Sequence, residues 1–89
     1  MNVEYRKLFL KDLKKLKRQP IYSTIYELVF TTLPQAASLQ TLSNVKALAG
    51  TTNQYRIRVG DYRIGLEVNG DNVEVMRVLH RREFYRYFP

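Results

Sequence analysis

The sequence predicts an α+β fold, in which a short N-terminal strand and a two-helix hairpin pack on an antiparallel β-sheet. Two observations carry this prediction. In the first half of the chain, apolar residues recur at the spacing of an amphipathic helix, whereas from Tyr55 onwards they alternate with polar residues at the period of a strand. The 89 residues suffice for one compact unit, so a single domain spanning residues 1–89 is expected.

The first half is predicted to hold one strand and two helices. Residues 2–5 form the strand. The stripe of the first helix follows at i, i+4 and i+7, with a further leucine beside it: Phe9, Leu13, Leu16 and Leu10. Pro20 breaks this helix and suits the first turn of the second. The second stripe ends at residues 31–34 and comprises Ile21, Ile25, Leu28 and Val29.

The second half is predicted to hold a meander of three strands. Residues 35–53 are expected to be a loop with one helical turn at residues 45–48, closed by Gly50. Gly60-Asp61 forms a two-residue turn with glycine at the position that a type II′ turn requires. The strands cover residues 55–59, 62–68 and 73–79, and the last is apolar on both faces and so interior. Residues 83–88 form a short C-terminal helix or an extended tail.

Composition narrows the classes of function. The chain has no cysteine and one histidine, which excludes disulfides and cysteine-based zinc sites and argues against a structural metal. Its net charge of +7 favours an acidic partner, namely nucleic acid, an anionic membrane surface or an acidic protein segment, although solubility alone is an alternative explanation. No segment resembles a signal peptide or a spanning helix, so a cytoplasmic location is expected.

Arginines are predicted to gather on one face of the sheet. The Gly60-Asp61 turn sets Arg58 opposite Arg63 and Arg56 opposite Gly65, on the face away from the helices. Two arginines directly opposite each other repel, which an anion lying between them would explain. Gly65 is expected to leave room for that anion, and Arg81 joins from the end of the last strand. Ordinary solvent-facing arginines are the alternative.

The C-terminal tail interleaves aromatic and basic residues, as single-stranded RNA recognition does. Phe84 and Phe88 can instead close the core, and a lone His80 can be structural or functional. Lys14 and Lys15 lie on a basic helix face that is either solvated or in contact with RNA. The candidate RNA-binding residues are Lys14, Lys15, Arg82, Arg86 and Tyr87.

The runs YRIRVGDYRIGLEV and VEVMRVLHRREFYR resemble the RelE/ParE toxin superfamily of bacterial and archaeal type II toxin–antitoxin pairs. The resemblance is strong over residues 48–87 and general before them. It implies a strand, two helices and a curved antiparallel sheet, and an antitoxin protein as partner in a hetero-oligomer. RelE toxins cut mRNA in the ribosomal A site, so contacts to mRNA and rRNA are implied, whereas ParE toxins poison DNA gyrase.

The resemblance also implies an active site without metal or cofactor. The catalytic positions of RelE fall on Arg56, Arg58, Arg63, Arg81, His80 and Tyr85, with Tyr87 as an alternative to Tyr85. RelE toxins carry lysines where this chain has Arg56 and Arg58, and arginine cannot act as a base at neutral pH. The 2′-OH of RNA would therefore be activated by His80 or Tyr85, leaving a 5′-OH and either a 2′,3′-cyclic phosphate or a 3′-phosphate. A gyrase inhibitor and a non-catalytic RNA-binding module are the alternatives.

Overall fold

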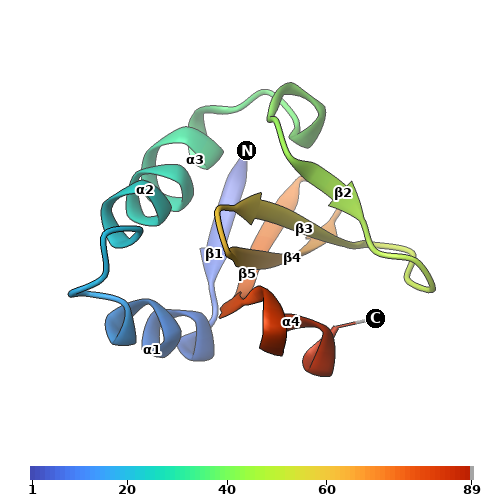
Figure 1. The fold of residues 1–89 in the computed structure, drawn as a ribbon. Coiled ribbons are helices and arrows are strands. Elements are labelled where there is room, and N and C mark those ends of the chain that lie inside the picture. Colours follow the sequence, from blue (N-terminus) through green and yellow to red (C-terminus); the bar gives the residue numbers. More distant parts are fainter. Residues whose placement is uncertain (89) are drawn as a thin grey trace.

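The computed structural model describes residues 1–88, which fold into a five-stranded sheet with the order β1-β5-β4-β3-β2 (Figure 1). The first strand pairs in parallel with β5, and the other neighbours are antiparallel. The α+β class is confirmed, and the parallel first strand makes the sheet mixed. The strands are β1 (Asn2–Tyr5), β2 (Val45–Ala47), β3 (Gln54–Val59), β4 (Tyr62–Asn69) and β5 (Asn72–His80).

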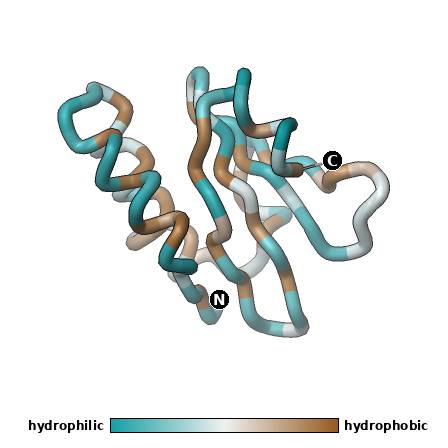
Figure 2. The backbone as a smooth tube through the Cα atoms, turned by 90° about the horizontal axis from the view of Figure 1, so that it is seen from below, coloured by the Kyte–Doolittle hydropathy of each residue, from teal (hydrophilic) through white to brown (hydrophobic). Residues whose placement is uncertain are grey.

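The N-terminal helices form a layer on one side of the sheet, and the C-terminal helix lies on the other (Figure 2). The apolar stripes face the sheet, where they meet Ile57, Ile64 and Leu66. Removing such side chains from water contributes roughly 1.5–3 kcal/mol each. The buried helical residues are Phe9, Leu13, Ile25, Val29 and Leu33. Leu10 departs from the prediction because it lies one residue beyond the stripe and stays 45% exposed.

The second helix is longer than predicted. The chain stays helical through α2 (Tyr22–Glu27), η1 (Leu28–Thr32) and α3 (Leu33–Gln35), after α1 (Lys7–Lys15). The expected end at residues 31–34 is wrong, because η1 is a π-helical turn that carries the helix past both threonines. Pro34 is the second residue of α3 and donates no backbone hydrogen bond, and the helix ends one residue later at Gln35.

The helical turn expected at residues 45–48 is also wrong. These residues form the edge strand β2, which pairs with β3 through Val45↔Ile57, Lys46↔Arg56 and Ala47↔Tyr55. The helical turn of this loop lies earlier, at η2 (Leu39–Thr41). Asn44 precedes the strand with a φ of 65°, a left-handed conformation that asparagine tolerates. The prediction failed because three residues are too few for a period to show.

A second apolar cluster fixes the C-terminal helix α4 (Arg81–Tyr87) to the outer face of the sheet. Phe84 and Phe88 stack in parallel at 4.4 Å and are buried with Leu48 and Leu79. The prediction that Gly65 leaves room for an anion is wrong, because the ring of Phe88 fills the space. A Cβ at position 65 would have three ring atoms of Phe88 within 3.0 Å. The glycine therefore serves helix packing.

Candidate nucleic-acid interface

The outer face of the sheet carries a row of basic side chains at the end near the β3–β4 turn. Its register is as predicted, with Arg58 opposite Arg63 and Arg56 opposite Gly65. Gly60 has a φ of 57°, which suits the first central position of a type II′ turn. Strand β2 adds Lys46 beside Arg56. We call Lys46, Arg56, Arg58 and Arg63 the basic row. Lys46 was not predicted to belong to it, because the strand β2 was not predicted.

Neutral acceptors hold the arginines of the basic row. Arg56 Nη1 donates to the Asn44 carbonyl at 3.4 Å, and Arg58 Nη2 donates to the Asn44 side-chain oxygen at 3.3 Å. Arg63 Nη1 donates to the carbonyls of Gly60 and Tyr62 at 2.9 and 3.0 Å. These bonds orient the guanidinium groups without neutralising them. Within residues 1–88 none of these four side chains is in a salt bridge, so the row offers positive charge to an anionic ligand.

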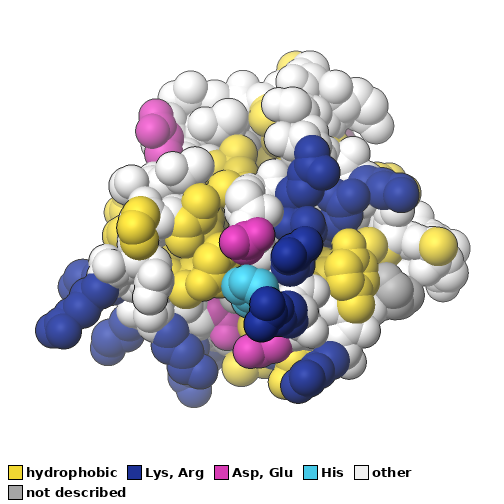
Figure 3. All heavy atoms as spheres, viewed as in Figure 1, with side chains coloured by type: hydrophobic (Ala, Val, Ile, Leu, Met, Phe, Trp, Pro, Cys, Tyr) yellow, Lys and Arg dark blue, Asp and Glu magenta, His cyan; other side chains and the backbone are white. Residues whose placement is uncertain are grey.

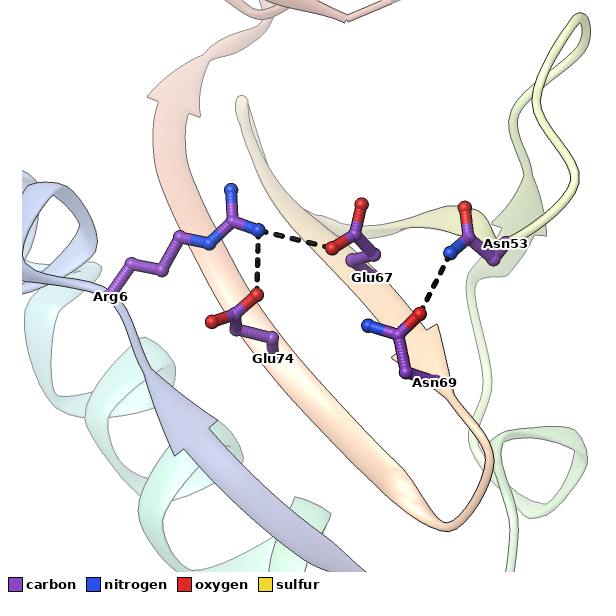
Figure 4. A network of polar contacts seen from close by, with 5 residues as sticks. All are labelled: Arg6, Asn53, Glu67, Asn69 and Glu74. Carbon is purple, nitrogen blue, oxygen red and sulfur yellow. Dashed lines mark hydrogen bonds and ion pairs between the residues drawn. The ribbon is translucent and has the colours of Figure 1, made fainter.

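The far end of the same face is acidic. Glu67 and Glu74 are opposite each other on β4 and β5, and Arg6 bridges them through Nη2 at 3.1 and 2.6 Å (Figure 4). Hydrogen bonding to Glu74 is the main reason that the pKa of Arg6 is raised. Asn53 and Asn69 are linked nearby at 3.1 Å. The two carboxylates share one guanidinium, so this end of the face is less favourable to a polyanion than the basic row.

Helix α4 brings Arg81 to the β3–β4 turn beside the basic row. The Arg81 amide donates to the Asp61 carbonyl at 2.7 Å, and its Nε lies 3.7 Å from an Asp61 carboxylate oxygen. Arg63 and Arg81 therefore both contact the β3–β4 turn. Tyr85 lies one turn further along the same flank, because residues i and i+4 of a helix share a side, and it is 52% exposed. Both groups are open to a ligand on the row.

His80 is the N-cap residue of α4, at the end of β5. Its Nδ1 accepts from the Arg82 amide at 3.2 Å, so in this arrangement the ring proton of the neutral imidazole lies on Nε2. The ring packs edge-on against Tyr62, its register partner, on the face opposite the basic row. A cavity of about 280 Å³ lies there, lined by Lys15, Arg77, His80, Glu83 and Tyr87 among others.

The candidate residues thus fall into two adjoining groups. Arg56, Arg58 and Arg63 lie on the basic row, Arg81 contacts its turn, and Tyr85 shares a flank of α4 with Arg81. By contrast, Lys15, His80 and Tyr87 line the cavity between α1 and α4. Lys14, Arg82 and Arg86 are exposed beside them. On the face seen in Figure 3, the histidine lies between the basic side chains of α1 and those over β3 and α4. The histidine and a set of basic side chains therefore share the face of the molecule seen in Figure 3.

Sequence reasoning missed a buried ion pair at the edge of this surface. Asp12 is 7% exposed, and its two oxygens accept from Arg77 Nε at 2.7 Å and Nη2 at 3.0 Å. Asp12 lies three residues after Phe9, on the apolar stripe of α1, and this misplaced charge was the signal available in the sequence. The hydrogen bonds that Arg77 donates to Asp12 raise the pKa of Arg77, which therefore stays charged.

Comparison with known proteins matches this arrangement to one family. The family model described as the ParE toxin of the type II toxin–antitoxin system, parDE, matches residues 3–85. The protein Toxin RelE3 of Methanocaldococcus jannaschii is 46% identical over 90 residues, which cover all of both chains. The chain belongs to the RelE/ParE toxin family. The RelE/ParE resemblance in the β-hairpin and tail is therefore confirmed.

Solved structures agree with this assignment. The RelB–RelE antitoxin–toxin complex from Methanococcus jannaschii has a chain that is 42% identical, with a TM-score of 0.67 over 97% of this chain and 99% of that one. The RelBE2 complex from Mycobacterium tuberculosis is 26% identical, with a TM-score of 0.68 over 90% and 96%. YafQ from E. coli, at 15% identity and a TM-score of 0.73 over 94% and 97%, shares the fold. Within residues 1–88, no helix has the length and apolarity needed to cross a bilayer.

Proposed function

We propose that this toxin is an endoribonuclease that cuts mRNA in the ribosomal A site. The observation that carries the proposal is the basic row with Arg81 and Tyr85 beside it, a set of fixed cations next to one exposed group that can exchange a proton. The identity to Toxin RelE3 supports the RelE branch over the ParE branch. Anionic RNA would lie along the row, and the acidic hairpin end would limit its path.

The proposed reaction uses the nucleophile that RNA carries. The 2′-OH attacks the adjacent phosphorus, the bond from phosphorus to the 5′-oxygen breaks, and the products are a 2′,3′-cyclic phosphate and a 5′-OH. Arg56, Arg58, Arg63 and Arg81 would stabilise the extra negative charge of the transition state. No metal is needed for this step because the guanidinium groups supply the positive charge.

Tyr85 is the best-placed group for proton transfer. It shares a helix flank with Arg81, whereas Tyr87 lies on the opposite flank of α4. His80 has one nitrogen engaged in the helix cap, so only Nε2 would be available to a substrate. The proton that leaves the 2′-OH must be replaced by one delivered to the departing 5′-oxygen, and we assign this transfer to Tyr85, with His80 in second place. Arginine takes no part as a base, since it keeps its proton at neutral pH.

The test is cleavage on translating ribosomes. Purified protein is incubated with them, and mRNA ends are mapped by primer extension. We expect cuts in phase with codons, and a loss of about 100-fold or more for Arg81→Ala and for Tyr85→Phe. Tyr26→Phe, at an exposed tyrosine of α2, is the matched control and should keep full activity. Folded protein that leaves the mRNA intact would contradict the proposed endoribonuclease activity.

An acidic antitoxin is the proposed partner. The solved relatives include complexes of RelE toxins with RelB antitoxins, and the net charge of +7 suits an acidic protein. We expect a small acidic reading frame beside this gene. Co-expression of its product should end the growth arrest caused by the toxin and yield a stable hetero-oligomer by size-exclusion chromatography. Growth arrest that persists with the neighbour present would contradict this partner.

Gyrase inhibition is the second candidate, because the matching family model is that of the ParE toxin. A supercoiling assay with DNA gyrase discriminates the two functions. Inhibition of supercoiling without any cut in mRNA would favour the ParE activity. RNA binding that Arg81→Ala weakens, with cleavage by no variant, would instead indicate a non-catalytic RNA-binding module.

A further inference from the structure

Asp12 stands out in the core. Among residues 1–88 it is the one charged side chain that is buried. It accepts three hydrogen bonds, two from Arg77 and one from the Val78 amide at 3.3 Å. Strand β1 pairs with β5 only as far as Val75, so the Val78 N–H lies beyond the end of β1 and donates to Asp12 instead. A buried ion pair is weak evidence for stability, since apolar residues of similar size often stabilise a fold as well.

Arg77 links Asp12 to the helix that carries the candidate active site. One edge of its guanidinium faces Asp12, and its central carbon lies 5.0 Å from the centre of the Tyr87 ring. A guanidinium over an aromatic face is an attractive cation–π contact. Helix α1, strand β5 and helix α4 thus meet through three side chains, Asp12, Arg77 and Tyr87, which we call the relay.

The helical geometry of α4 couples the position of Tyr87 to the positions of Arg81 and Tyr85. Successive residues of an α-helix are rotated by about 100°, so Tyr87 lies on one flank and Arg81 and Tyr85 on the other. Phe84 and Phe88 lie between the flanks, against the sheet. Any rotation of α4 about its axis moves both flanks together. A rotation of about 10° shifts atoms at the outer radius of a helix, about 5–6 Å, by about 1 Å.

We propose that the Asp12–Arg77–Tyr87 relay is a positioning device, which sets the rotation of α4 and so aims Arg81 and Tyr85 at the scissile phosphate. This inference rests on the proposed cleavage of RNA. A misplacement of about 1 Å can cost about 100-fold in rate. The relay residues touch no reacting atom in this scheme, so their effect falls on the rate of the bound complex and not on binding.

The kinetic test separates positioning from contact. Single-turnover cleavage of ribosome-bound mRNA is measured against toxin concentration for Arg77→Lys and Tyr87→Leu. Lysine keeps the charge of Arg77 but lacks the planar fork. We expect the rate at saturation to fall about 10- to 100-fold and the half-saturating concentration to change less than about threefold. Tyr87→Phe, which keeps the ring, should regain most of the rate that leucine loses.

The opposite pattern overturns the proposal. If Tyr87→Leu weakens half-saturation and leaves the saturated rate intact, Tyr87 is an RNA contact. Tyr26→Leu in α2 is the matched control for loss of an exposed tyrosine ring, and it should alter neither parameter. Melting temperatures are recorded for every variant, so that a loss of rate is read only from folded protein.

A second readout does not depend on RNA cleavage. In two-dimensional NMR spectra, Arg77→Lys and Tyr87→Leu should shift the amide signals of residues 81–86 and the side-chain Nε–H signal of Arg81. Tyr26→Leu should leave them in place. Unshifted signals in both relay variants would overturn the relay. Wild-type protein that leaves mRNA intact would instead overturn the proposed function, while the shifts still decide the relay.

Discussion

Arg58 and Arg63 are directly opposite each other, and each guanidinium is held by neutral oxygens. Like charges at such cross-strand positions destabilise a sheet. The Asp61 carboxylate lies nearby, but it faces Arg81 at 3.7 Å and both side chains are more than half exposed. The repulsion within the basic row is therefore retained in the free protein. A phosphate between the two arginines would remove it.

Replacing Arg58 should stabilise the free protein and weaken its binding to RNA. In Arg58→Thr the repulsion with Arg63 is lost and a residue suited to strands is introduced. We expect a gain of roughly 0.2–1 kcal/mol, near the lower end because the site is exposed. Thermal unfolding at low salt measures the gain, which should shrink at 1 M salt. Arg18→Gln, an exposed cation outside the row, is the control. A melting temperature below wild type would refute the repulsion argument.

Tyr5 links β1 to the helical layer, and its ionisation at alkaline pH should lower the stability of the fold. Its hydroxyl donates to the Val29 carbonyl at 2.7 Å, and burial raises its pKa above the ordinary value of 10.0. A raised pKa means that the fold favours the neutral phenol. The contribution of Tyr5 is therefore complete below pH 10 and is lost as the pH rises through the pKa of the folded state.

Tyr5→Phe should be less stable than wild type at pH 7, by roughly 0.5–1.5 kcal/mol for the lost hydrogen bond. This difference should narrow above pH 10, because wild type must then bury a phenolate or unfold, whereas phenylalanine does not titrate. Chemical denaturation of both proteins between pH 7 and 11 measures the difference. Tyr26→Phe, at a half-exposed ring, serves as control. A difference that stays constant with pH would show that Tyr5 does not titrate in the fold.

At the scale of elements, the part of the site that sequence could predict is the part set by local rules. Gly60-Asp61 fixed the hairpin register, and with it the face of Arg56, Arg58 and Arg63. By contrast, Lys46 reached the row only through β2, a three-residue edge strand formed by pairing with β3. The side of α4 that His80 and Tyr87 occupy depends on how Phe84 and Phe88 dock, which is a tertiary contact that no spacing encodes.

The docking of α4 can be tested at Gly65. A methyl group there collides with the buried ring of Phe88, so Gly65→Ala should destabilise the protein by roughly 1–3 kcal/mol and displace α4. Combining it with Phe88→Leu, which shortens the side chain, should cost less than the sum of the two single changes. Urea denaturation of the four proteins closes this double-mutant cycle. Strictly additive losses would mean that the glycine and the ring do not compete for space.

At the scale of the molecule, charge is distributed so that binding depends on salt. The chain carries +7 net, with the basic row and α4 at one end of the outer face and the Glu67–Glu74 pair at the other. Each cation that contacts a phosphate releases a condensed counterion when RNA binds. The logarithm of the binding constant should then fall linearly with the logarithm of salt concentration, by about 0.7 per contact for single-stranded RNA.

The slope of that dependence counts the contacts and so tests the extent of the row. Arg56→Gln and Lys46→Gln should each lower the slope by about 0.7, because each removes one phosphate contact, whereas Arg18→Gln should leave it unchanged. Fluorescence anisotropy with a short labelled single-stranded RNA, titrated at several salt concentrations, gives the slopes. Equal decreases for Arg18→Gln and Arg56→Gln would mean that net charge alone attracts RNA. A decrease confined to the row would mean that RNA follows β2 and β3, away from the acidic hairpin.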